Sequence, residues 1–266
     1  MTAAAPDRPR RRGVWIALAV VTALVVVTPA LLKASGRALR QTASSVTPYH
    51  HAIKELRLDL DGADVSVGPG QDGEARVYKD LRWGLSKPDV TESLTGDVLI
   101  VTFRCPGTDV LGGDCGADID VQVPAGTRVS AVSGSGEINI RGLAGDLDLR
   151  TGTGGIGVAD ARGRLRLRAR SGAITATGLR SPDTRARVSS GSLDLRYAEP
   201  PDIVEASTGS GTAKIIVPPG SRYAVHAGTG SGSTHLNQAV IDPHSSRSIS
   251  VHSGSGTTYV DYRDET

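Results

Sequence analysis

Residues 128–140 read RVSAVSGSGEINI, and this pattern recurs six more times before the C-terminus. Apolar and polar side chains alternate on both sides of a Ser/Thr-Gly signal, as they do again in residues 147–158, LDLRTGTGGIGV. The first glycine of the signal recurs at intervals of 18, 20, 19, 18, 21 and 24 residues. A period near 20 residues indicates a repeat architecture. The seven signals begin at Ser133, Thr151, Ser171, Ser190, Thr208, Thr229 and Ser253.

When the copies are aligned on these seven residues, the positions four and two residues earlier are always apolar, and the position between them is always polar. This is the in/out alternation of a β-strand with one buried face. A second alternating run follows each signal, for example Ile138 and Ile140. Each period therefore carries two strands joined by a glycine corner. We predict an all-β domain built as a single-stranded β-solenoid or β-helix-like stack of ~20-residue coils, in which each strand pairs with its counterpart in the next coil. The alternative is an antiparallel β-sandwich or meander in which the SGSG segments are hairpin loops.

The composition agrees with a thin stack of coils. The chain has 33 Gly, one Phe and one Met, and only 3% of its residues are aromatic, so columns of Val, Ile, Leu and Ala must form the core. The formal net charge of +2 is too close to zero to indicate nucleic acid as a partner.

The N-terminal region has the composition of a membrane anchor. Residues 1–13 form a basic tail with four arginines, and Val14–Leu32 follows without a charge. Nineteen helical residues would be about 28 Å long, enough to cross a bilayer core of roughly 30 Å. Residues 33–52 are polar and indicate a juxtamembrane linker, and 53–262 form the β-strand-repeat domain. We predict a single-pass protein of the cell membrane with a cytoplasmic N-terminus and an extracytoplasmic C-terminal domain. The alternative is a cleaved signal peptide and a secreted domain.

Cys105 and Cys115 are the only cysteines, and they flank a short loop that is rich in glycine. An exported compartment permits disulfides, and two cysteines this close together favour one structural bridge. Metal binding by two thiols alone is not expected.

Basic residues gather on the outward face of two successive coils, where the alignment sets Asp146 and Asp148 beside Arg166 and Arg168. The ordinary interpretation is a solvated face with cross-strand ion pairs. The functional interpretation is a site for an anionic ligand, either an envelope polyanion or a phospholipid head group. We call this candidate site the arginine face; its residues are Arg164, Arg166, Arg168, Arg185 and Arg187.

Catalytic patterns are missing from the sequence. A polysaccharide-active β-helix enzyme, the third function considered, needs carboxylates placed across a groove. The acidic pairs here, such as Asp118 and Asp120, are spaced i, i+2 on an outward strand face. The sequence contains no nucleophile elbow, phosphate-binding loop or zinc-protease motif. We therefore predict a protein that is not an enzyme, with no cofactor and no metal site.

Residues 53–262 resemble the bacterial putative-adhesin family of β-strand repeats. The motifs that carry the resemblance are VPAG at 123–126, VSGSGEINI at 132–140, TGTGGI at 151–156 and VSSGSL at 188–193. The resemblance implies an adhesin-like interaction scaffold in the cell envelope and assigns no catalytic residue. It also implies an alternative role, a regulatory module of an envelope-stress system that contacts a membrane partner. The expected partners are thus the membrane, through the N-terminal helix, and an envelope polymer or a membrane protein.

Overall fold

The computed structural model describes residues 15–24, 41–50, 53–71, 73–84, 86–106 and 115–263. Within these ranges the one α-helix covers Trp15–Leu24, and its side chains are exposed. Ten helical residues are about 15 Å long, half of a bilayer core. Among the residues described, no helix is both long and apolar enough to cross a membrane. The described helix is therefore too short for the span predicted over Val14–Leu32, whose other residues lie outside the described part, as do residues 1–13.

The remainder of the described chain is mostly β-strand, which confirms the all-β prediction for the domain. The strands form one curled, mixed sheet. In chain order they are β1 (Gln41–Tyr49), β2 (Glu55–Leu60), β3 (Asp64–Pro69), β4 (Ala75–Trp83), β5 (Asp89–Thr95), β6 (Val98–Arg104), β7 (Cys115–Val123), β8 (Arg128–Ser135), β9 (Ile138–Arg141), β10 (Leu147–Thr153), β11 (Ile156–Ala159), β12 (Leu165–Leu179), β13 (Asp183–Tyr197), β14 (Ile203–Val217), β15 (Ala224–Leu236) and β16 (Ser248–Tyr262).

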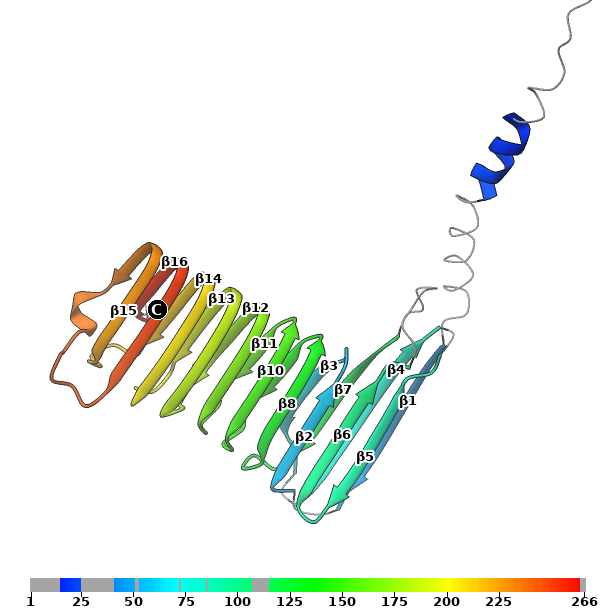
Figure 1. The fold of residues 1–266 in the computed structure, drawn as a ribbon. Helices are drawn as coiled ribbons and strands as arrows, with labels where there is room; N and C mark the ends of the chain where they lie inside the picture. The colour runs from blue at the N-terminus through cyan, green and yellow to red at the C-terminus, as the bar shows by residue number, and fades with distance from the viewer. Residues whose placement is uncertain are drawn as a thin grey trace, which may run out of the picture.

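Parallel pairing in register builds the middle of the domain, where β8, β10, β12, β13 and β14 are successive neighbours. The strands β9 and β11 continue the coils of β8 and β10 on a second wall, and β11 also pairs with β12. From β12 onward one long strand runs through both walls and bends at the Ser-Gly corner. The coils lie side by side along the molecule (Figure 1). This arrangement agrees with the stacking predicted from the repeat.

The predicted register is wrong in two coils. The structure pairs Leu147 with Leu165 and Thr153 with Ser171, whereas the alignment on the first Ser or Thr of each signal set Leu147 beside Leu167. Where a signal has two glycines, the corner is therefore the second one. A strand has a side-chain period of two, so a slip of two residues keeps the correct face inward but changes every pair across the coils.

The N-terminal end of the domain contains antiparallel strands. The alternative prediction expected such strands throughout the fold. β4 pairs antiparallel with β1 and β7, and β5 pairs antiparallel with β6. The predicted linker 33–52 is thus wrong over residues 41–49, which form β1.

Lys79 of β4 makes an ion pair with Glu92 of β5, and the Tyr49 hydroxyl donates to Glu92 Oε2 at 2.6 Å. Burial and the neighbouring Glu92 carboxylate raise the pKa of Tyr49. These three side chains connect the two edge strands of this end.

The C-terminal end does not follow chain order. β16 pairs with β14 on one side and with β15 on the other, so the last strand of the chain lies inside the stack and β15 lies at its end. We expected each coil to stack on the one that precedes it in sequence, which is wrong for this last pair. The segment between β15 and β16 contains the 3₁₀ turn Gln238–Val240.

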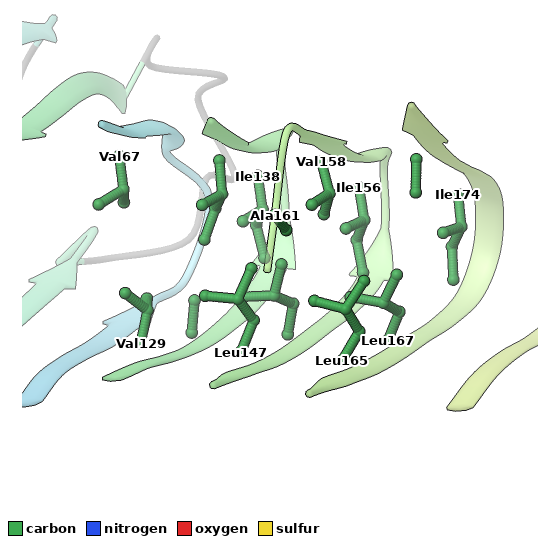
Figure 2. Close-up of a cluster of buried hydrophobic side chains, with 14 of the residues drawn as sticks. Val67, Val129, Ile138, Leu147, Ile156, Val158, Ala161, Leu165, Leu167 and Ile174 are labelled. Atoms are coloured by element: carbon green, nitrogen blue, oxygen red, sulfur yellow. The ribbon is translucent and has the colours of Figure 1, made fainter. Parts of the chain in front are cut away.

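The core consists of columns of aliphatic side chains that run from coil to coil. One column joins Val129, Leu147 and Leu165 on the first wall, and another joins Ile138, Ile156 and Ile174 on the second. All six are at most 2% exposed, and Figure 2 shows the two columns facing each other between the walls. Burying an aliphatic side chain of this size contributes about 1.5–3 kcal/mol. The repeat is therefore stabilised mainly between neighbouring coils.

Glycine is required at the corners because the coils approach one another there. Gly172 has φ of 134°, and a Cβ at this position would lie 1.9 Å from the carbonyl oxygen of Gly154 in the preceding coil. In the signals that have two glycines, the opening Ser or Thr is buried or half-buried and lies near corner carbonyls: Ser133 Oγ donates to Ser135 O at 2.6 Å, and Ser253 Oγ donates to Gly211 O at 3.3 Å. Ser171 and Ser190, which open the two signals with one glycine, are exposed. The corner of every signal therefore needs a backbone that only glycine allows, and the two-glycine signals add an inward-facing hydroxyl.

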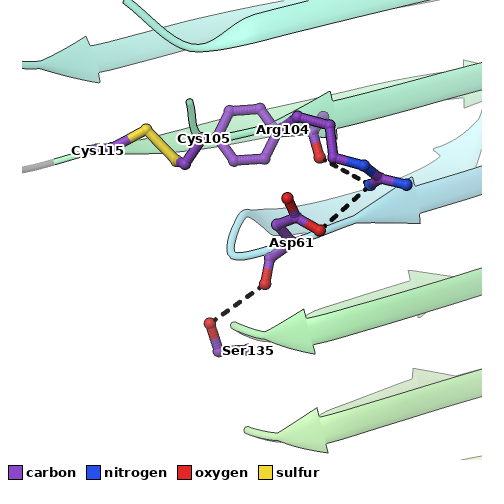
Figure 3. Close-up of a disulfide and its surroundings, with 6 residues drawn as sticks. Asp61, Arg104, Cys105, Cys115 and Ser135 are labelled. Atoms are coloured by element: carbon purple, nitrogen blue, oxygen red, sulfur yellow. Dashed lines mark hydrogen bonds and ion pairs between the residues drawn. A yellow bond between two sulfur atoms is a disulfide. The ribbon is translucent and has the colours of Figure 1, made fainter. Parts of the chain in front are cut away.

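The structure joins Cys105 and Cys115 in a disulfide, with Cα atoms 6.1 Å apart. The bridge connects the end of β6 to the start of β7, and residues 107–114 between them lie outside the described part. Figure 3 shows that Arg104, next to the bridge, reaches Asp61 in the turn after β2, at 3.3 Å. The disulfide thus fixes the end of β6 to the start of β7, beside the first parallel coils.

Candidate functional site: the arginine face

The arginine face lies on the outer surface of the first wall, where β12 and β13 are neighbours. Its side chains point outward because they alternate with the buried residues Leu165, Leu167 and Ala186. Arg166 pairs with Arg185, and Arg168 pairs with Arg187, in the parallel ladder. Neighbouring strands are about 4.8 Å apart, so these four guanidinium groups share one small patch.

Carboxylates neutralise two members of the arginine face. Arg164 Nη2 donates to Asp146 Oδ2 at 2.9 Å, and this bond holds the pKa of Asp146 below its ordinary value. Arg185 lies 3.6 Å from Asp183 and 3.7 Å from Glu205. The predicted juxtaposition of Asp146 and Asp148 with Arg166 and Arg168 is corrected by two residues: Asp146 meets Arg164, and Asp148 stands beside Arg166 in the ladder.

The other three members have no carboxylate partner within the described part of the chain. Arg166 and Arg168 make no hydrogen bond or ion pair there, and Arg187 donates only to the Ser207 hydroxyl, at 3.2 Å. Asp148, which could have paired with Arg166, is instead bound by Arg150 in its own strand, at 3.0 Å. We call Arg166, Arg168 and Arg187 the unpaired trio.

A surface pocket of about 360 Å³ lies over this patch. Its polar lining comes from four successive strands, β12, β13, β14 and β16, and it combines the arginines with hydroxyl groups and a histidine. The polar residues that line it are Arg168, Arg185, Arg187, Glu205, Ser207, Ser250 and His252. A second pocket of about 330 Å³ adjoins Arg164 and Arg166. Both pockets offer hydrogen-bond donors to an extended ligand.

Ser207, Ser250 and His252 also line this site, and their place in it was not predicted from the sequence. They lie in the strand segments just before the signals that start at Thr208 and Ser253. Only the pairing of β14 with β16 sets them beside the arginines. The polar columns of those two coils were visible in the sequence, but the order of the coils was not.

No three His, Cys, Asp or Glu side chains of the described ranges gather closely enough to hold a metal ion. Of the acidic pair that was weighed for catalysis, Asp118 accepts from Arg82 at 2.6 Å, and Asp120 lies two residues further along the same strand, β7. The chemistry that the arginine face offers is therefore recognition of an anion by guanidinium groups.

The toastrack family model, Toastrack DUF4097, matches residues 115–264, which is more than half of the chain. Among solved structures, a putative cell adhesion protein from Clostridium sporogenes is 11% identical, with a TM-score of 0.40, and the match covers 84% of this chain and 100% of that one. A putative adhesin from Bacteroides fragilis is 13% identical, with a TM-score of 0.49, over 83% of this chain and 97% of that one. No curated protein matches this chain at a significant level.

Proposed function

This chain belongs to the toastrack DUF4097 family, and from the arginine face we propose that its β domain is a non-enzymatic interaction scaffold that binds phosphate-rich polymers of the cell envelope. The domain is a solenoid-like stack with antiparallel strands at its N-terminal end. The observation that carries the proposal is the unpaired trio, Arg166, Arg168 and Arg187, exposed on two neighbouring strands.

Charge repulsion argues that this patch has a ligand. Arg168 and Arg187 are directly paired across β12 and β13, and Arg166 is paired with Arg185. Like charges that face each other across a ladder destabilise a sheet. Elsewhere on this wall the ladder sets opposite charges side by side, as at Asp148 and Arg166 or Arg185 and Glu205, but Arg150 also faces Arg168 and adds a further like charge to the patch. A bound polyanion would offset the repulsion at the trio.

The guanidinium group selects the kind of anion. Arginine binds phosphate and carboxylate oxygens through two parallel N–H donors, and such charge-assisted bonds are stronger than neutral ones. Because the trio and its pocket cross the strands, the favoured ligand is a chain of phosphodiesters that lies along the stack. Lipid head groups offer the same phosphodiester chemistry, and the experiment below separates the two sources.

The location of the domain is part of the proposal. Residues 8–12 carry four arginines, and the apolar segment Val14–Leu32 follows. This order supports a cytoplasmic N-terminus, a membrane tether and an extracytoplasmic β domain. The Cys105–Cys115 disulfide supports an oxidising compartment.

The test measures the binding of the full chain, reconstituted into phosphatidylcholine nanodiscs, to soluble poly(glycerol phosphate) and separately to vesicles of phosphatidylglycerol. The variant carries Arg166→Gln, Arg168→Gln and Arg187→Gln. We expect its affinity for the soluble polymer to fall about tenfold or more, because three charge-assisted hydrogen bonds are lost. Binding of the vesicles alone would assign the site to lipid and overturn the polymer proposal.

A matched control removes the same charge from arginines that already have carboxylate partners. It carries Arg57→Gln, Arg82→Gln and Arg196→Gln, whose partners are Glu55, Asp118 and Asp194. We expect this control to bind the polymer like the unmodified chain. Equal losses in both triple variants would show attraction to net charge alone and would refute the site.

A further inference from the structure

The C-terminal end of the stack is an open sheet edge. Within the described ranges β15 pairs with β16 and with no other strand. It is 13 residues long, and Figure 1 shows it at the opposite end of the domain from β1 and β5. An edge strand presents unpaired N–H and C=O groups to any strand that can approach it.

Two sets of backbone bonds show which groups point outward. The Ala224 N–H donates to the carbonyl of Arg247, which immediately precedes β16, at 2.9 Å. Tyr223 faces the other way: its N–H donates to Val240 O at 2.9 Å, and its C=O accepts from Asp242 N–H at 2.8 Å. Because successive residues of a strand alternate sides, Val225 and Ala227 direct their backbone groups away from β16.

The segment before β16 closes only the base of this end. Val240 is fully buried, and the Tyr262 hydroxyl donates to Ala239 O at 2.7 Å. Its pairing with the edge is a single bridge, between Tyr223 and Ile241. Beyond this bridge, no other strand of the described ranges pairs with the edge of β15.

The side chains of β15 also lack a covering coil. Val251 and Val260 of β16 are each 1% exposed, whereas their partners Ala227 and Leu236 in β15 are only half-buried. Stacked repeats bury their apolar face only against a neighbour, so a terminal coil usually carries a polar cap. Here one more layer would complete the core column.

The other end of the stack is protected, and β15 is not. β5 carries Asp89 and Glu92, and β1 carries Pro48, which are devices that block edge pairing. β15, with the sequence AVHAGTGSGSTHL, has no Lys, Arg, Asp, Glu or Pro. Pairing of β15 with the β1 or β5 edge of another copy, which would build a filament, is therefore opposed. Two β15 edges, in contrast, carry no Lys, Arg, Asp or Glu that would repel each other.

We propose that β15 pairs with β15 of a second copy of this chain, forming a closed dimer with two-fold symmetry. A two-fold interface brings the same patch from both partners together, so the half-buried residues Val225, Ala227 and Leu236 of one copy would lie against the same set in the other, with the strands antiparallel. Thirteen residues can exchange about ten backbone hydrogen bonds, as many as a typical protein–protein interface carries. The dimer joins the ends remote from β1 and leaves the arginine faces of both copies accessible.

The experiment measures the mass of the full chain in detergent by sedimentation over a range of concentrations. The variant Ala227→Pro removes one outward N–H without touching the ladder to β16. The matched control Ala227→Val keeps the N–H and also enlarges the side chain. We expect a dimer for the unmodified chain and for Ala227→Val, and a monomer for Ala227→Pro, with a twofold difference in mass.

A second measurement needs no variant. Amide hydrogen exchange at Val225 and Ala227 should slow about tenfold between dilute and concentrated samples, because pairing protects these groups. A monomer at every concentration, exchange that is independent of concentration, or a dimer that persists in Ala227→Pro would each overturn the proposal. Dissociation of Ala227→Val would assign the contact to side chains and would likewise refute edge pairing. None of these outcomes bears on polymer binding at the arginine face.

Discussion

Asp146 and Arg164 meet across two neighbouring coils through two hydrogen bonds. Asp146 Oδ2 accepts from Arg164 Nη2 at 2.9 Å, and Asp146 Oδ1 accepts from the Arg164 backbone N–H at 3.0 Å. The carboxylate thus binds both the side chain and the main chain of the residue that starts the next coil. This pair links the start of β10 to the start of β12 at the margin of the arginine face, and we expect it to make the stability of the stack depend on pH in acid.

Asp146→Asn should remove a pH-dependent part of the stability. The pKa of Asp146 is lowered in the fold from its ordinary value of 3.8. A lowered pKa contributes stability above 3.8 that is lost as the pH falls below it. We expect the urea midpoint of the unmodified chain to fall between about pH 4 and pH 2 more steeply than that of Asp146→Asn. Asp148→Asn is the control, because Asp148 pairs with Arg150 in its own strand and so its ion pair does not join two coils. An identical acid response of Asp146→Asn and the unmodified chain would contradict the prediction.

Gly191→Ala should disrupt the stack. Gly191 has φ of 140°, and a Cβ there would lie 1.8 Å from the Gly172 carbonyl oxygen. We expect the free energy of unfolding to fall by about 3 kcal/mol or more, measured by chemical denaturation, because backbone strain and a clash add. Gly220→Ala separates the two causes: its φ is 77°, but nothing lies within 4 Å of the added Cβ. A loss in Gly191→Ala no larger than in Gly220→Ala would show that the close approach of the corners does not matter.

Replacing both cysteines, Cys105→Ser with Cys115→Ser, should lower the free energy of unfolding by about 2–3 kcal/mol, because the bridge restricts the unfolded chain. Urea unfolding with and without a reductant provides the measurement. The reductant should destabilise the unmodified chain and leave the double variant unchanged. If the reductant has no effect on the unmodified chain, the disulfide does not contribute to stability.

Tyr197→Phe should leave the stability unchanged or raise it. Tyr197 is 1% exposed, and its hydroxyl makes no hydrogen bond of acceptable geometry among the described residues, although the equally unsatisfied hydroxyl of Thr184 lies near it. Removing an unsatisfied buried hydroxyl is neutral or adds up to about 1 kcal/mol. Tyr262→Phe is the control, because the single O–H of Tyr262 is shared between two carbonyl oxygens, Ala239 O at 2.7 Å and Ser221 O at 2.9 Å, and its loss should cost about 1 kcal/mol. Equal losses in both variants would show that Tyr197 has a partner, such as a buried water.

The same residue should make the fold sensitive to alkali. Burial raises the pKa of Tyr197 above its ordinary value of 10.0. A raised pKa contributes stability that is fully present below 10.0 and is lost as the pH rises above it. Thermal unfolding of Tyr197→Phe should therefore depend less on pH above that value than unfolding of the unmodified chain. Parallel pH profiles would contradict this assignment.

The sequence alone determined the strands of the repeat, their buried face and the composition of the arginine face. Alternation with period two decides which side chains face inward, and this holds even where the register is misjudged, as it was for Leu165 and Leu167. The spacing of Cys105 and Cys115 was sufficient to pair them. These features depend on neighbours in the chain, so local patterns reveal them.

Only the tertiary structure decided which residues meet across the coils. The register of β12 puts Arg164 on Asp146 and leaves Arg166 unpaired, and two equally regular alignments differ only in these long-range contacts. The insertion of β16 between β14 and β15 has no local signal either, because both strands carry the same pattern and both could stack on β14. β1 is a strand through its pairing with β4, despite a polar sequence without a strand period. Packing between distant segments selects among these alternatives, and it thereby decides which arginines and which sheet edge remain free to bind.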